Sequence, residues 1–474
     1  MVTKQDIDDA IARMDFFEWL RYVKILEPFP GRGEIPFEAW PHLLDIGQQM
    51  IDYNLLAWLK SRQLGCSWLV AAYTLWVASY NEGVHVIEFA QNEPKAAELI
   101  AKQKYIYSRL PEGLKTPVKS MENQLELVFP GTDSYIRAHP STKDASRGLT
   151  ATIAWFDECD FHEYFDQAYS TAKATIDDIG GQFILTSTAN PEKAVEGSTF
   201  QNIYSNAPDN GFKAIFYGWQ SRGERTQEWY EKVKKNAIDL FAFQKEHAAT
   251  DLEALSAPEN IVFFDREILT EMMNDNKAPV KTVSHQNIYQ PPSIGKKYVA
   301  ATDTSHGVGG DDAVTVVIDL ATGYVVADIK SNVLTPEQLA DESVQLLDLY
   351  KSPLWAIEDN DWGAVTIRKA VELGYKNFYH YKKDTIGWHT GHSNRFFLWG
   401  ELAEAIVDRG ITIPSQAGLK QFFTVIRNPK KQGRIEAQAG RHDDYPMALA
   451  IAWQMRKYGI RHRSSGKIVS TSTL

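Results

Sequence analysis

A segment of eight residues between an apolar run and a helical run has the residue types that bind phosphate. The segment reads Lys60-Ser61-Arg62-Gln63-Leu64-Gly65-Cys66-Ser67. Gly65 and Ser67 fit the phosphate-loop pattern G-x-x-x-x-G-K-[ST], whereas Cys66 stands where the pattern has lysine. Backbone amides at a helix N-terminus favour a phosphate group, and the Ser67 hydroxyl can ligate Mg²⁺. Lys60 or Arg62 could supply the missing cation. The alternative is an ordinary strand-turn-helix junction.

Two carboxylates follow the apolar run at residues 152–156. At the end of such a strand, Asp157 would hold Mg²⁺ and Glu158 would polarise the water that attacks ATP. The next apolar run leads into small polar residues that can sense the γ-phosphate, namely Ser187, Thr188 and Asn190. Acids at a strand end are common on their own. The three motifs in this order favour an ATPase that binds ATP with Mg²⁺.

An arginine beside a glycine precedes the run that carries these acids. Arg147 and Gly148 form the pair. Such an arginine can stabilise the transition state of phosphoryl transfer, either in its own subunit or from a neighbouring one. The alternative for Arg147 is a surface side chain, and both interpretations stay open.

Acidic residues also recur where apolar runs end in the C-terminal half of the chain. Asp303, Glu358, Asp443 and Asp444 are the main candidates, and Asp312 and Asp359 are weaker ones. Crowded carboxylates repel one another unless cations neutralise them, and hard oxygen ligands suit Mg²⁺ or Mn²⁺. Two such ions can activate water and stabilise the leaving oxygen in phosphodiester cleavage. The alternative is a set of solvated turn acids. The 12 His show no metal-ligand spacing.

A basic stretch lies between the last two acidic motifs. Residues 366–441 carry 13 Lys and Arg against 6 Asp and Glu, which gives +7 within a chain of net charge −11. Two short segments at residues 422–426 and 434–437 flank a basic turn and predict a hairpin. Its cations could hold a DNA backbone, and they are Arg427, Lys430, Lys431 and Arg434. The alternative is a solvated turn.

The elements that must position these residues follow two patterns. Between residues 55 and 189, strand-like runs alternate with helical ones, which predicts a parallel sheet covered by helices. A second patterned block starts near residue 297 and ends in a helix at 445–458. Residues 3–25 have helical spacing and are expected to form one amphipathic helix.

The amino-acid composition excludes several classes of protein. The 474 residues are 44% hydrophobic, which excludes a mostly disordered chain, and 2 Cys exclude a disulfide framework. No targeting segment or membrane span is expected, since the longest apolar run, at residues 68–80, is too short for a bilayer. We expect an ATPase domain over 1–255, a linker over 256–296, a nuclease domain over 297–460 and a basic flexible tail over 461–474.

The ordered set of motifs resembles the large terminase subunit of tailed double-stranded DNA bacteriophages over residues 36–456. The matching pieces are Ser61-Arg62-Gln63-Leu64-Gly65, Trp155-Phe156-Asp157-Glu158, Ser187-Thr188-Ala189, Asp303, Glu358 and His442-Asp443-Asp444. The segment at residues 243–247 resembles the one that closes the ATPase domain of that family. Two departures are Cys66 at the lysine position and the lack of an adenine-side glutamine near Trp40. Lys60 fills the position of the lysine in the family's deviant loops.

The resemblance implies an α/β fold with a P-loop (ASCE-type) ATPase domain of mainly parallel sheet, followed by a ribonuclease-H-like nuclease domain. It implies a motor that hydrolyses ATP to move double-stranded DNA into a procapsid and cuts concatemers with two Mg²⁺ or Mn²⁺. The implied partners are the portal protein, a small terminase subunit and further copies in a ring, usually of five. The implied location is the host cytoplasm at the procapsid portal, and not the mature virion.

Two other classes compete with this interpretation. A DNA helicase or remodelling ATPase with an accessory nuclease would need a second recombinase-like core, where this sequence places strand-end acids instead. A structural virion protein with a decayed ATPase core would not need the acidic residues of both halves.

Overall fold

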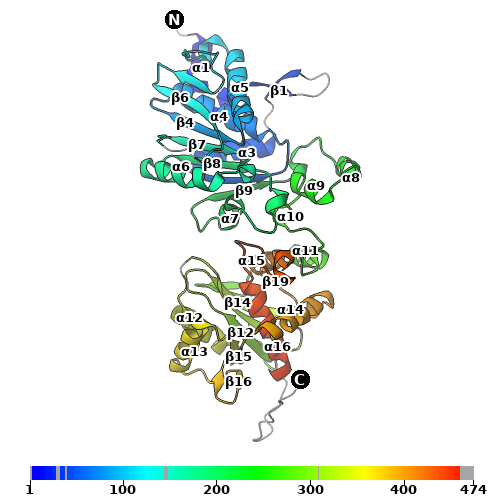
Figure 1. The fold of residues 1–474 in the computed structure, drawn as a ribbon. Coiled ribbons are helices and arrows are strands. Elements are labelled where there is room, and N and C mark those ends of the chain that lie inside the picture. Colours follow the sequence, from blue (N-terminus) through cyan, green and yellow to red (C-terminus); the bar gives the residue numbers. More distant parts are fainter. Residues whose placement is uncertain (1–2, 28–32, 38–39, 144–147, 308, 460–474) are drawn as a thin grey trace. The chain divides into compact units, whose positions relative to one another are not determined.

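The computed structural model describes residues 3–27, 33–37, 40–143, 148–307 and 309–459 (Figure 1). The chain divides into two compact units, Met1–Ser256 and Ala257–Leu474. No helix of the described ranges is long and apolar enough to cross a membrane.

A seven-stranded sheet forms the centre of the first unit, in the order β5-β6-β4-β7-β8-β3-β9. Every neighbouring pair is parallel except β5 with β6. The strands are β3 (Leu55–Lys60), β4 (His85–Ala90), β5 (Glu126–Phe129), β6 (Ser134–Pro140), β7 (Ile153–Asp157), β8 (Gln182–Ser187) and β9 (Lys213–Tyr217). Strand β8 lies between the phosphate-loop strand β3 and the acidic strand β7. This is the ASCE-type arrangement that the sequence predicts.

Helices cover both faces of this sheet (Figure 1). They are α3 (Pro41–Asp52), α4 (Cys66–Tyr80), α5 (Glu93–Arg109), α6 (Phe165–Ile179), α7 (Thr199–Ser205) and α10 (Asp251–Leu255). Two further helices, α8 (Gln227–Lys235) and α9 (Leu240–Glu246), lie beside the sheet and form a small cluster of their own with Trp219. Consecutive residues of β7 show the consequence: Trp155 packs in the core beneath α4 and α5, and Phe156 packs in the core beneath α6 and α7. A strand covered on both faces reads as a continuous apolar run, as β7 does.

The N-terminal segment is two helices and not the single helix expected over residues 3–25, so that prediction is wrong. Helix α1 (Lys4–Met14) ends at Asp15, and α2 (Phe16–Leu20) begins there. The Asp15 carboxylate accepts hydrogen bonds from the amides of Phe17 and Glu18, at 2.8 and 3.0 Å. An Asp that caps a helix N-terminus in this way stops the preceding helix. Strands β1 (Lys24–Glu27) and β2 (Gly33–Pro36) then pair with each other.

The second unit is built on a six-stranded sheet, in the order β10-β11-β14-β13-β12-β15. Its strands are β10 (Lys281–Val283), β11 (Gln286–Ile288), β12 (Tyr298–Asp303), β13 (Ala313–Asp319), β14 (Val325–Ser331) and β15 (Leu354–Ile357). Strands β12, β13 and β14 are antiparallel, and β15 runs parallel to β12. This order is the ribonuclease-H-like one that the sequence predicts.

Helices also cover both faces of the second sheet (Figure 1). They are α12 (Pro336–Leu349) and α13 (Asp361–Glu372) on one side and α16 (Asp444–Gly459) on the other. Helices α14 (His392–Val407) and α15 (Gln416–Phe422) pack on α16, and α11 (Arg266–Asn274) packs on α15. Ala300 of β12 packs in the core with α12, whereas its neighbour Val299 faces Gly459 of α16. The shorter strands are β16 (His380–Lys382), β17 (Thr385–Ile386), β18 (Val425–Asn428) and β19 (Arg434–Ala437).

The expected linker at residues 256–296 is largely folded. It contains α11, β10 and β11, and β11 pairs with β14 at the edge of the second sheet. Gln286 and Ile288 of β11 are buried. Strands of three residues carry too little periodicity to be recognised in the sequence, so this segment belongs to the second unit and not between the units. The expected tail at 461–474 lies outside the described residues.

Candidate functional site

The phosphate-loop segment joins the end of β3 to the start of α4. Lys60 ends β3, and Gly65 caps the helix that begins at Cys66. Gly65 has φ +83°, and a Cβ atom there would lie 3.1 Å from Leu43 and 3.3 Å from Trp40. Any other residue would therefore be strained and crowded. The sequence expectation of a strand-loop-helix at this point is correct.

The ammonium group of Lys60 pairs with the second acid of β7. Its Nζ atom lies 2.6 Å from Oε1 of Glu158. Burial is the largest single influence and would lower the pKa of Lys60, but the charges around the ammonium, that of Glu158 first, together with the hydrogen bond to Glu158 raise this pKa above its usual value. Burial would raise the pKa of Glu158, and the Lys60 ammonium reverses the effect and lowers it. Both groups are therefore charged near neutral pH.

Asp157 receives two hydroxyl groups from flanking elements. Ser67 at the start of α4 lies 3.1 Å from Oδ2 of Asp157, and Thr186 of β8 lies 3.0 Å from Oδ1. Burial and the nearby Glu158 raise the pKa of Asp157. A buried carboxylate beside a hydroxyl offers the oxygen ligands that Mg²⁺ prefers. Ser67 and Asp157 thus suit the Mg²⁺ of a bound nucleotide.

The polar residues after β8 all bond to the segment that follows β7. The amide of Thr188 donates to Oε2 of Glu158 at 3.0 Å. The Ser187 hydroxyl accepts from the amide of Asp160 at 3.1 Å, and the amide of Asn190 donates to the Asp160 carboxylate at 2.6 Å. Thr188 is therefore bonded directly to Glu158, and Ser187 and Asn190 are bonded to Asp160, two residues further along the chain.

Arg62 and two other loop residues are held by the C-terminal part of the first unit. The Arg62 guanidinium lies 2.6 Å from Oε1 of Glu246, and the Arg62 amide donates to the Glu246 carbonyl at 2.8 Å. The Ser61 hydroxyl donates to the carbonyl of Ala248 at 2.7 Å. The Gln63 carbonyl accepts from Arg222 at 3.3 Å. Ser61 and Gln63 thus fix the shape of the loop.

A cavity of about 380 Å³ opens beside these groups. Its lining includes five of the predicted residues, namely Arg62, Ser67, Asp157, Glu158 and Thr188. It also includes Lys95 and Lys102 of α5 and Glu246 of α9, which sequence reasoning missed. Residues seven apart lie on one face of a helix. The spacing of Lys95 and Lys102 within a predicted helix therefore indicates that both face the same side.

The other predicted residues of this site that the structure describes are not part of the lining, namely Lys60, Ser61, Gln63, Gly65, Cys66, Ser187 and Asn190. Cys66 is buried, and burial raises the pKa of its thiol, so it carries no charge that could bind or repel phosphate. Arg147 lies outside the described residues, and its role stays a prediction.

Four acids of the second unit converge at one edge of its sheet. Asp303 ends β12, Glu358 follows β15, and Asp443 and Asp444 lie at the start of α16. Burial and the charges of Glu358 and Asp444 raise the pKa of Asp303 well above its usual value. Burial and nearby acids raise the pKa of Asp444 to about 8. Like charges crowded in this way call for cations, and their oxygen donors fit Mg²⁺ or Mn²⁺.

Two further acids near the cluster, and Asp443 of the cluster itself, are engaged by other groups. The Asp312 carboxylate pairs with Lys330 at 2.7 Å and accepts from Gln421 at 2.7 Å. Asp359 pairs with His389 at 3.0 Å. Asp443 pairs with Arg395 at 3.1 Å. Asp312 instead supports the cluster through its backbone amide, which donates to Asp444 at 2.8 Å.

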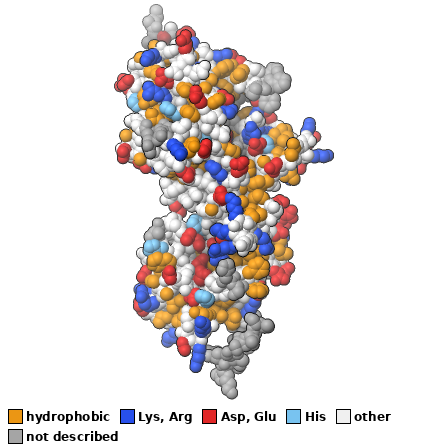
Figure 2. All heavy atoms as spheres, viewed as in Figure 1, with side chains coloured by type: hydrophobic (Ala, Val, Ile, Leu, Met, Phe, Trp, Pro, Cys, Tyr) orange, Lys and Arg blue, Asp and Glu red, His pale blue; other side chains and the backbone are white. Residues whose placement is uncertain are grey.

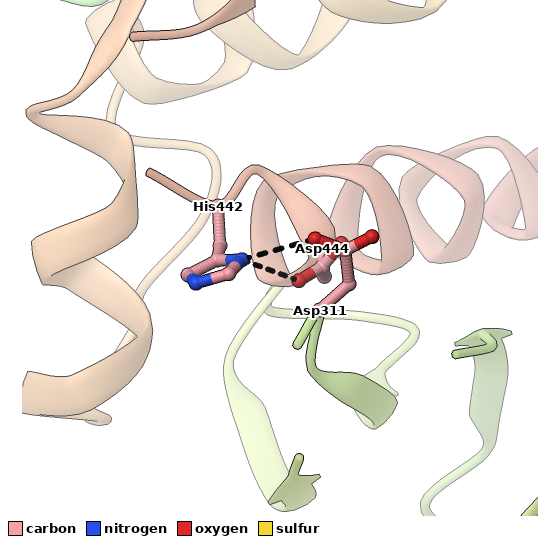
Figure 3. Close-up of side chains that lie close together, drawn as sticks. All are labelled: Asp311, His442 and Asp444. Atoms are coloured by element: carbon pink, nitrogen blue, oxygen red, sulfur yellow. Dashed lines mark hydrogen bonds and ion pairs between the residues drawn. The ribbon is translucent and has the colours of Figure 1, made fainter. Parts of the chain in front are cut away.

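His442, which sequence reasoning set aside, points toward two carboxylates (Figure 3). Its Nδ1 atom lies 3.2 Å from Asp311 and 3.8 Å from Asp444. The ligand atoms of these three residues lie within 4.8 Å of one another. The position of His442 directly before Asp443 and Asp444 in the sequence is the feature that indicates its place beside these acids.

The predicted basic hairpin is present as β18 and β19. In the view of Figure 2, Lys and Arg side chains gather over the region of β19 in the second unit. Lys431 and Arg434 share one carboxylate, Glu436, at 2.7 and 3.3 Å. Arg427 lies over the ring of Phe263 at 4.8 Å. DNA binding by these residues stays a prediction.

Comparison with known proteins gives one family match and several structural similarities. Residues 58–259 match the family described as "Terminase large subunit, T4likevirus-type, N-terminal". The HK97 bacteriophage large terminase is 12% identical, with 95% of this chain and 99% of that chain covered at a TM-score of 0.43. The large terminase of the thermophilic bacteriophage D6E with ADP is 14% identical, with 87% and 98% covered at 0.38. The large terminase nuclease of phage G20c with magnesium is 18% identical, with 42% and 98% covered at 0.35. TM-scores below 0.5 do not by themselves establish a shared fold.

Proposed function

We propose that the chain is a viral DNA-packaging motor, because its residues 58–259 match the family described as the N-terminal part of a terminase large subunit. The first unit hydrolyses ATP and drives double-stranded DNA into a procapsid. The second unit is a metal-dependent endonuclease that cuts concatemeric DNA. The observation that carries this proposal is the presence, in one chain, of the Lys60–Glu158 site and the acidic cluster around Asp303.

At the ATPase site, each residue has a distinct task. Ser67 and Asp157 hold the Mg²⁺ of MgATP, and the loop amides before α4 hold its phosphates. Glu158 accepts the proton of the attacking water, which its lowered pKa permits at neutral pH. Lys60 holds the Glu158 carboxylate in place and remains the first candidate for the loop cation, with Arg62 as support.

At the nuclease site, Asp303, Glu358 and Asp444 would hold two Mg²⁺ or Mn²⁺ ions, with Asp443 as a further candidate. When bound, such ions activate water and stabilise the leaving oxygen of the cut strand. Asp312 positions Asp444 through its amide, since its own carboxylate is taken by Lys330. The hairpin cations Arg427, Lys430, Lys431 and Arg434 hold the DNA backbone.

The partners follow from the family. We expect the chain to dock on the portal of a procapsid in the host cytoplasm, to receive DNA through a small terminase subunit and to work as a ring. In such a ring Arg147 can act in its own subunit or in the next one.

Two variants of the full chain test the proposal. Glu158→Gln should bind ATP but lose hydrolysis by about 10²–10⁴-fold, because the amide cannot take a proton. Asp303→Ala should lose cleavage of plasmid DNA with Mg²⁺ or Mn²⁺ and keep ATP hydrolysis. Loss of both activities in Asp303→Ala, with the fold intact, would contradict the division into two sites. ATP-driven unwinding of a forked duplex without packaging would favour a helicase instead.

A further inference from the structure

A second cavity, of about 460 Å³, lies between the start of α14 and the turn of the β18–β19 hairpin. Its lining is Thr390, Gly391, Arg395, Phe396, Trp399, Lys431, Gln432, Gly433, Arg434 and Ile435. Three of these side chains are cations and none is a carboxylate. A cavity of this size with this lining suits a small anionic group.

Three hydrogen-bonding atoms of this cavity's lining are buried without a partner among the described residues. They are Nε1 of Trp399, Nε of Arg395 and Oγ1 of Thr390. The indole and guanidinium nitrogens only donate, and the hydroxyl can donate. Buried donors without acceptors are costly, so an acceptor-rich ligand that reached these three donors would gain binding energy from them.

The cavity also offers an aromatic face. Phe396 is 59% exposed although it lies on the cavity wall. An exposed aromatic ring beside cations is the combination that binds single-stranded nucleic acid, in which bases stack and the groove holds the backbone. A base inside a duplex already stacks on both sides, so only an unpaired base can use this ring.

Arg395 connects this cavity to the acidic cluster. Its guanidinium lies 3.1 Å from Oδ2 of Asp443, which directly precedes Asp444. A ligand held by Arg395 is therefore next to the residues proposed to hold the metal ions.

We infer that this cavity binds one unpaired nucleotide of the DNA strand next to the cleavage site. Its phosphate contacts Arg395, Lys431 and Arg434, and its base stacks on Phe396. Lys431 and Arg434 already share the single carboxylate of Glu436, so the pair keeps an excess positive charge for the phosphate. This inference rests on the proposed nuclease function, and it names the cavity as the place where that nuclease contacts an unpaired nucleotide of its DNA substrate.

The test compares two adjacent phenylalanines in the full-length chain. Phe396 lines the cavity, whereas Phe397 is 68% exposed and is not part of its lining, so Phe397→Ala is the matched control. The readout is the anisotropy of a short labelled single-stranded oligonucleotide without divalent metal. Phe396→Ala should weaken binding about tenfold, the loss expected for one stacked base. Phe397→Ala should bind like the unmodified chain, and ATP hydrolysis should be unchanged in both.

Further arms separate the outcomes. Equal oligonucleotide binding by Phe396→Ala and Phe397→Ala overturns the inference. Binding of a free nucleoside 5′-monophosphate as tight as that of the oligonucleotide also overturns it, because the cavity then serves free nucleotides. Trp399→Phe, which removes the indole N–H donor together with part of the ring, should weaken binding severalfold while the melting temperature shows that the variant folds. If the unmodified chain cuts no DNA but Phe396 still matters for binding, the proposed nuclease function fails and the nucleotide site stands.

Discussion

The ammonium of Lys60 and the carboxylate of Glu158 lie 2.6 Å apart, although 98 residues separate them in the sequence. The side chain of Lys60 is 5% exposed and that of Glu158 is 39% exposed. The pair joins the end of β3 to the end of β7 past the intervening strand β8. Lys60 therefore orients the proposed catalytic base as well as contributing charge near the phosphate loop.

Removing this ammonium should abolish ATP hydrolysis. In Lys60→Ala the Glu158 carboxylate loses its cation, so its pKa rises and its position is no longer fixed. We expect a fall in kcat of about 10²-fold or more, measured by steady-state phosphate release. Cys66→Lys in the same background should restore part of the activity by placing a lysine at the usual loop position. Normal hydrolysis by Lys60→Ala would show that this lysine only ends a strand.

Lys102 of α5 should contribute to ATP binding. It lines the nucleotide cavity, and its charge lowers the pKa of Asp157. Lys102→Ala should raise KM for ATP about tenfold, because the loss of one contact between an ammonium and a phosphate weakens binding by roughly that factor. Lys104→Ala on the same helix is the control, because Lys104 donates to the backbone carbonyls of Met121 and Asn123. Equal KM values for the two variants would remove Lys102 from the site.

The acidic cluster should destabilise the metal-free second unit. Asp303→Asn replaces a buried carboxyl group, whose ionisation burial and the neighbouring acids oppose, with a neutral amide, so thermal unfolding without metal should occur at a higher temperature. The gain should be about 1 kcal/mol or more, since one unit of pKa shift corresponds to about 1.4 kcal/mol. Added Mg²⁺ should stabilise the unmodified chain and not the variant. Equal stabilisation of both by Mg²⁺ would place the ion elsewhere.

A buried acid in the first sheet predicts a pH dependence of stability. Glu88 of β4 accepts hydrogen bonds from Gln103 and Thr74, and burial raises its pKa to about 8 from an ordinary 4.5. Its folded-state pKa is raised, so its stabilising contribution is complete below pH 4.5 and is lost as the pH rises to 8. The loss should be of order 1 kcal/mol per pH unit in this window. Urea unfolding at pH 6, 7 and 8 should show a weaker dependence for Glu88→Gln, and equal slopes would contradict the assignment.

The sequence predicted the strand-end acids because parallel strands bring their carboxyl ends to one edge. Asp157, Asp303 and Glu358 were found in this way. It could not predict that Lys330 neutralises Asp312, because that pair depends on the register between β13 and β14. Side chains contributed by a covering helix, such as Lys102, were also missed, since the strand-end rule says nothing about them.

The phosphate loop is tied to the end of the first unit. Arg62 bonds to Glu246 and Ser61 to Ala248, while Lys245 donates to the carbonyls of Ala254 and Ser256. Ser256 is the last residue of that unit. If ATP binding moves this loop, as the proposed function requires, the movement acts on bonds that extend to the last residues of the first unit. Helix α9 therefore connects the phosphate loop, through Glu246, to the last residues of the first unit, through Lys245.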